Sequence, residues 1–130
     1  MGDAKKSILI IEDEFIIAED LAVSLRQQGY QVAVAFSDLE EAIVLSRQTL
    51  PDLILMDIKW QADFEWIKIA NTVWEELGIP VAYITACSTD NLKALGVLRD
   101  TIFCLQKPYR ERELYAVIEK ALKKKRGTKK

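Results

Sequence analysis

The sequence predicts an α/β protein in which a parallel β-sheet is covered by helices on both faces. Short apolar runs alternate with helix-length amphipathic segments, and turn residues separate the two. The apolar runs contain almost no polar residues, as is typical of parallel strands buried on both faces. Right-handed crossovers then give a three-layer, doubly wound (βα)5 sandwich. These patterns leave the strand order open.

Five apolar runs are the expected strands of the sheet, and each is short enough to cross a small domain once. The third follows the turn residues Pro51 and Asp52. The strands are expected at residues 8–11, 31–35, 53–56, 81–84 and 102–106.

Five amphipathic segments follow these strands and are the expected helices. The first has apolar residues at helical spacing up to Gly29, and the third ends before Gly78 and Pro80, which are common stop signals. A capping-box pattern from Ser37 to Glu40 opens the second. The helices are expected from Phe15 to before Gly29, from about 39 through 46, from Ile67 to Leu77, from Asp90 to about Arg99, and from Glu111 to Lys125.

Four of the strands end on residues that can bind phosphate or a metal ion. In an open α/β sheet, ligands bind outside the carboxyl ends of the strands, so these residues should share one edge. Three carboxylates, a hydroxyl and an ammonium would then form one site. Two carboxylates 4 Å apart repel by about 4 kcal/mol at an effective dielectric near 20, and a divalent cation with oxygen ligands, such as Mg²⁺, relieves this. The residues are Glu12, Asp13, Asp57, Thr85 and Lys107.

Composition restricts the class of protein further. The chain of 130 residues is half hydrophobic, which suits one domain with one core. Seven of its 18 basic residues lie in 120–130; the preceding 119 residues hold the other 11 against 20 acids, a net charge of −9. An acidic body disfavours nucleic-acid binding. The basic end could contact nucleic acid or acidic lipid, but a solvated end that suits the negative pole of the last helix is favoured. No run has transmembrane length, and no signal sequence is expected at the start of the chain.

The chain contains no histidine and only two cysteines, Cys87 and Cys104. Histidine-based metal sites, Ser-His and Cys-His nucleophiles and a phosphohistidine in this chain are therefore excluded. Two cysteines make neither a disulfide framework nor a zinc site, so a reduced, cytoplasmic setting is expected.

Over residues 6–124 the sequence resembles the receiver domain of two-component response regulators, in a chemotaxis-regulator-like form. The motifs are Glu12-Asp13-Glu14 after the first strand, Leu-Met-Asp57 at the third, Ile-Thr85-Ala86 at the fourth and Lys107-Pro108-Tyr109 after the fifth. Each is weak alone, but four in order are specific. The resemblance implies a flavodoxin-like five-stranded parallel sheet of order 2-1-3-4-5. It also implies one receiver domain over 1–130, with a basic tail at 123–130.

The resemblance assigns roles residue by residue. Asp57 is the phosphoacceptor; Glu12, Asp13 and Asp57, with the backbone carbonyl of Lys59, hold Mg²⁺. Thr85, the backbone of Ala86 and Lys107 respond to the phosphoryl group. Lys59 and Cys87, two residues beyond Asp57 and Thr85, are candidates for setting the lifetime of the acyl phosphate.

The sequence departs from the family pattern at two places. Glu65-Trp66 stands where Asp-Gly commonly opens the third helix, so the loop after Asp57 is expected to be rebuilt. Trp66, like Trp60, either shields the acceptor, forms a partner surface or packs in the core, and packing is favoured. Cys104 occupies the position where the family often has a switching aromatic residue. Since Phe103 points to the opposite face, the usual coupling between threonine and aromatic residue is expected to be weak, and Cys104 is favoured as a small buried residue over a redox sensor.

The expected function is a phosphorylation-controlled switch. Its expected partners are a histidine kinase or phosphotransfer protein and a downstream protein or output domain, with a homodimer through the fourth helix, fifth strand and fifth helix as a further candidate. Beyond self-phosphorylation from small donors and slow autodephosphorylation, no enzyme activity is expected. Haloacid-dehalogenase-type phosphatases need a second aspartate where Lys59 stands, and flavodoxin-like electron carriers need a phosphate-binding loop where Glu12 and Asp13 stand. The alternative is an interaction module that works without phosphorylation.

Overall fold

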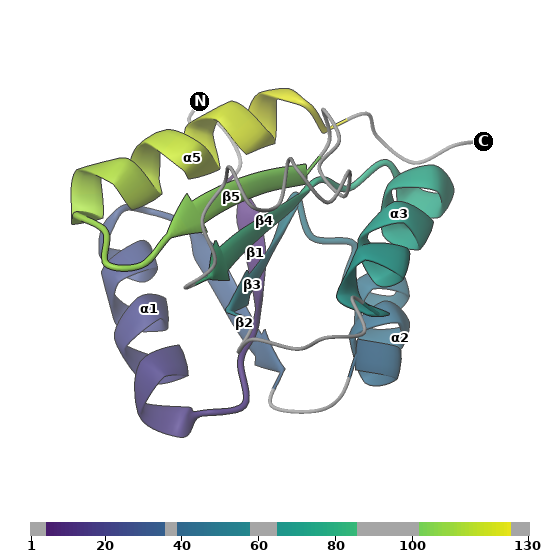
Figure 1. Ribbon diagram of the computed structural model, residues 1–130, viewed down its shortest axis with the longest axis horizontal. Coiled ribbons are helices and arrows are strands. Elements are labelled where there is room, and N and C mark those ends of the chain that lie inside the picture. Colours follow the sequence, from purple (N-terminus) through teal and green to yellow (C-terminus); the bar gives the residue numbers. More distant parts are fainter. Residues whose placement is uncertain (1–4, 36–38, 58–64, 86–101, 126–130) are drawn as a thin grey trace.

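The computed structural model describes residues 5–35, 39–57, 65–85 and 102–125. Five parallel strands form one sheet in the order β2-β1-β3-β4-β5, which confirms the predicted α/β fold class and strand order (Figure 1). The strands are β1 (Ser7–Ile11), β2 (Gln31–Ala35), β3 (Leu53–Asp57), β4 (Val81–Thr85) and β5 (Ile102–Gln106).

Two pairs of helices cover the sheet, with α1 and α5 on one face and α2 and α3 on the other (Figure 1). The helix expected at 90–99 lies outside the described residues. Within the described part of the chain, no helix is long and apolar enough to cross a membrane. The helices are α1 (Phe15–Gln27), α2 (Leu39–Thr49), α3 (Glu65–Leu77) and α5 (Glu111–Lys123).

The helix ends agree with most of the predicted stop signals. Gly29 and Gly78 follow α1 and α3 with φ of 94° and 69°, a conformation that glycine adopts without strain. Three boundaries differ from prediction. The second helix ends three residues later, at Thr49, the third begins two residues earlier, at Glu65, and the last ends two residues earlier, at Lys123.

Side chains along each strand alternate between two separate cores, one on each face of the sheet. In β3, Leu53 and Leu55 pack beneath α1 and α5, while Ile54 and Met56 pack beneath α2 and α3. All five residues of β3 are buried. This burial on both faces explains the continuous apolar runs in the sequence, because a central parallel strand has no solvent-facing side.

The strand register brings the carboxyl ends of the central strands to one edge. Asp57, the last residue of β3, lies opposite Ile84 of β4, and Thr85 lies opposite Gln106 of β5. The backbone N–H of Lys107 donates to the carbonyl of Thr85 at 2.8 Å, which extends the β4–β5 pairing by one residue. The predicted acceptor and the predicted lysine are thereby held at the same end of the sheet.

Candidate functional site at the carboxyl edge of the sheet

The centre of the site is an ion pair between Asp57 and Lys107. Lys107 Nζ donates to Asp57 Oδ1 at 2.7 Å, although the two residues are 50 positions apart. The Asp57 side chain is only 3% exposed and that of Lys107 is 37% exposed. A carboxylate this buried needs a charged partner, since an unpaired buried charge costs several kcal/mol. Lys107 therefore offsets the charge of the buried Asp57 carboxylate at the sheet edge.

Glu12 is the second buried acid of the site, with 2% relative exposure. Its Oε1 accepts the backbone N–H of Glu14 at 2.9 Å. Its Oε2 has no hydrogen-bond donor within the described residues. Burial raises the pKa of Glu12 most, and the neighbouring carboxyls of Asp57 and Asp13 add to the rise. Although the N–H of Glu14 opposes it, the resulting pKa is about 8. Without a cation, Glu12 is therefore mainly protonated at neutral pH.

This environment fits a hard divalent cation in its chemistry. Asp57 and Asp13 can only accept hydrogen bonds while ionised, so either a proton on Glu12 or a cation must satisfy the buried Oε2. In the arrangement described, Asp57 is turned to Lys107. No group of three or more acidic or cysteine side chains among the described residues is placed to hold a metal ion as it stands.

Tyr109 lies near the site, and the sequence predicted no role for it. Partial burial raises the pKa of its phenol, and the negative charge of Asp57 raises it further, with a smaller contribution from Asp20 of α1. The phenol therefore lies within electrostatic range of the acceptor. The sequence feature that could have indicated a place near the site is the position of Tyr109 directly after Lys107-Pro108. The peptide bond between Lys107 and Pro108 is cis.

The remaining predicted site residues are placed as follows. Thr85 ends β4 and is partly exposed. Cys104 of β5 is partly buried and packs on the α2/α3 face, while Phe103 packs on the opposite face, as the alternation predicted. The predicted roles of Lys59, Ala86 and Cys87, and the interpretation of Trp60, concern positions outside the described residues.

Trp66 packs in the core, in the first turn of α3. It is 6% exposed, and its ring meets that of Tyr83 edge-on, with centroids 4.0 Å apart and an interplanar angle of 66°. The Tyr83 hydroxyl donates to the carbonyl of Trp66 at 3.0 Å. Tyr83 lies opposite Cys104 in the β4–β5 pairing. The favoured interpretation of Trp66 as a packing residue is confirmed, and its ring anchors the start of α3 to β4.

Comparison with known proteins agrees with this geometry. The family described as "Response regulator receiver domain" matches residues 8–119. The transcriptional regulatory protein PdtaR of Mycobacterium tuberculosis is 32% identical over 117 residues, which are 90% of this chain and 57% of PdtaR. The chain thus spans little more than half the length of this relative.

Two solved structures show the same fold. The anti-anti-sigma factor PhyR of Bartonella quintana is 31% identical with a TM-score of 0.71, over 92% of this chain and 48% of PhyR. A two-component response regulator of Clostridium difficile is 26% identical with a TM-score of 0.73, over 92% and 97% of the two chains. By its sequence match and its fold, this chain belongs to the response regulator receiver domain family.

Proposed function

We propose that this chain accepts a phosphoryl group on Asp57 and uses the modified site to switch a protein-interaction surface. The observation that carries the proposal is the buried Asp57 carboxylate held 2.7 Å from the Lys107 ammonium at the sheet edge. The donor would be a histidine kinase or a phosphotransfer protein in the cytoplasm. The recipient of the signal would be a downstream protein or output domain. The surface made by the expected fourth helix, β5 and α5 is a candidate interface for a homodimer.

The reaction needs one nucleophile and charge stabilisation. An Asp57 oxygen attacks the phosphorus of the donor phosphohistidine, the P–N bond breaks, and its electron pair returns to the imidazole nitrogen. An acyl phosphate forms, which water later hydrolyses. Lys107 offsets negative charge on the transferring group from its place beside Asp57.

Glu12, Asp13 and Asp57, with the carbonyl of Lys59, would hold Mg²⁺ in this proposal. The unsatisfied Oε2 of Glu12 supports it, since a cation replaces the proton that burial otherwise favours. When bound, Mg²⁺ would add further charge stabilisation to phosphoryl transfer. Thr85, the backbone of Ala86 and Lys107 would then contact the phosphoryl group, while Lys59 and Cys87 would set its lifetime.

We expect the wild-type protein to gain one phosphate on incubation with acetyl phosphate and Mg²⁺. Asp57→Asn should gain none, because an amide cannot form the acyl phosphate. Intact-mass analysis with and without Mg²⁺ measures this directly. Glu19→Gln, which alters an exposed acid of α1, is the matched control and should behave as the wild type.

A protein that stays folded and unmodified with both acetyl phosphate and a phosphorylated kinase would contradict the proposal. It would favour the second candidate, an interaction module that works without phosphorylation. The observation that favours this second candidate is that no group of three or more acidic side chains among the described residues is placed to hold a metal ion. An adduct that persists in Asp57→Asn would instead place the acceptor at another residue.

A further inference from the structure

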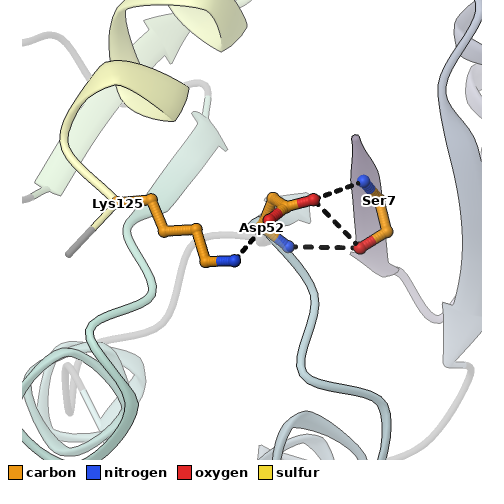
Figure 2. Close-up of polar contacts among 3 residues, drawn as sticks. All are labelled: Ser7, Asp52 and Lys125. Carbon is orange, nitrogen blue, oxygen red and sulfur yellow. Dashed lines mark hydrogen bonds and ion pairs between the residues drawn. The ribbon is translucent and has the colours of Figure 1, made fainter. Parts of the chain in front are cut away.

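A second aspartate–lysine pair lies at the opposite edge of the sheet, centred on Asp52 (Figure 2). Asp52 Oδ2 accepts the backbone N–H of Ser7 at 2.8 Å, and the N–H of Asp52 donates to the Ser7 carbonyl at 2.8 Å. Asp52 Oδ1 accepts Lys125 Nζ. Ser7, Asp52 and Lys125, here called the clasp, join the starts of β1 and β3 to the chain just beyond α5.

The carboxyl of Asp52 in the clasp is stabilised in its ionised form. Partial burial opposes ionisation of Asp52, but the hydrogen bonds from Lys125 and from the Ser7 N–H outweigh it and lower the pKa. The side chains of Asp52 and Lys125 are 16% and 32% exposed. A pair shielded to this degree is screened less by solvent than a surface ion pair.

One ion pair lies at each end of β3, and the two lysines lie in the segments that flank α5. Asp52 directly precedes β3 and Asp57 ends it, so the two carboxylates are separated by a strand of about 16 Å. Lys107 directly follows β5, and Lys125 lies two residues beyond α5, a helix of about 20 Å. In Figure 1, α5 starts beside the carboxyl end of β5 and runs back along the sheet. Each carboxylate at an end of β3 therefore pairs with a lysine from one of the two segments that flank α5. Lys107 precedes the helix by four residues, and Lys125 follows it by two.

β3 and α5, which lie between the two pairs, are closely packed. All of β3 is buried, and α5 packs onto the sheet through Leu114, Ile118 and Ala121. Close-packed elements move as units, and a displacement at one end of a helix must be accommodated at its other end. Before the helix, Lys107 contacts the predicted acceptor Asp57. After the helix, Lys125 contacts Asp52 at the other end of β3.

From this arrangement we propose that the clasp is thermodynamically coupled to the Asp57–Lys107 pair through α5. The clasp fixes the far end of the helix, and each pair strengthens the other by restricting the same rigid element. If Asp57 accepts a phosphoryl group as proposed above, the clasp also helps to position Lys107 for it, and this part rests on the proposed function. The coupling between the two ion pairs does not depend on phosphorylation.

A double-mutant cycle on unfolding tests the coupling. Lys107→Met and Lys125→Met each remove one ammonium and keep the aliphatic stem, and the equilibrium constant of unfolding is measured in urea for both single variants and the double variant. We expect the unfolding constant of the double variant to rise by a factor at least threefold smaller than the product of the two factors for the single variants. Lys124→Met, which removes the same charge from the neighbouring exposed residue, is the matched control and should combine with Lys107→Met to within about twofold.

Independent effects of Lys107→Met and Lys125→Met, within that twofold margin, would overturn the proposal. A second readout examines the functional part: Lys125→Met should bind the phosphoryl analogue beryllofluoride with Mg²⁺ about threefold to tenfold more weakly than Lys124→Met. Equal affinities would limit the clasp to a structural role. If no variant, nor the wild type, binds beryllofluoride or is phosphorylated, the proposed function fails, while the unfolding cycle still decides the coupling.

Discussion

Replacing Trp66 with alanine should lower the free energy of unfolding by about 3–5 kcal/mol, the range for deleting a large buried aromatic side chain. Trp66 is 6% exposed and packs edge-on against Tyr83, which is fully buried. The substitution leaves a cavity between the first turn of α3 and β4, and the close-packed surroundings relax only partly into it. Urea unfolding followed by circular dichroism measures the loss.

Two further variants separate the contributions at this contact. Tyr83→Phe keeps the ring but removes the hydroxyl that donates to the Trp66 carbonyl, and should cost about 1–2 kcal/mol. Trp74→Ala, at a half-buried position of the same helix, should cost less than Trp66→Ala. A Trp66→Ala protein as stable as the wild type would show that the tryptophan does not hold α3 to the sheet.

The second large effect is a dependence of stability on pH that is caused by Glu12. Its pKa is about 8 in the folded protein, against an ordinary value of 4.5, mainly because of burial. Between these pH values the folded state binds more protons at this position than the unfolded state, so stability falls as pH rises. Its contribution is fully present below about pH 4.5 and is lost as pH rises through about 8. The full change is of the order of several kcal/mol, since one pKa unit corresponds to about 1.4 kcal/mol.

Glu12→Gln isolates this contribution, because an amide has the same shape and does not titrate. In the metal-free protein the stability difference between Glu12→Gln and wild type should grow in favour of the variant from about pH 5 to pH 8. Mg²⁺ should reverse the order near pH 8, because the ion stabilises the wild-type carboxylate and has a weaker ligand in the amide. The comparison is made by urea unfolding with chelator or Mg²⁺, with Glu19→Gln as the control. Parallel profiles for Glu12→Gln and wild type would show that Glu12 ionises normally.

The sequence alone determined the fold class and the meeting of Asp57 with Lys107, for a local reason. Strand-length apolar runs and helical periodicity are properties of neighbouring residues, and both persist in the folded chain. Because parallel strands end at the same edge, residues directly after the strands must come together. Asp57 and Lys107, 50 positions apart, were expected to meet on this basis and lie 2.7 Å apart. The strand order came from the family resemblance.

Other features depend on contacts between distant segments, and only the tertiary structure decided them. The sequence predicted that Glu12 shares a site with Asp57, but it does not show the burial of Glu12, which is the main cause of its raised pKa. The sequence favoured packing for Trp66 but placed the start of the helix after it; in the structure Trp66 lies in the first turn of α3 and packs against Tyr83 of β4. Lys125 was expected to end a helix, and instead reaches Asp52, 73 positions away. Burial and charge pairing depend on which side chains converge in space, and chain-local patterns do not contain that information.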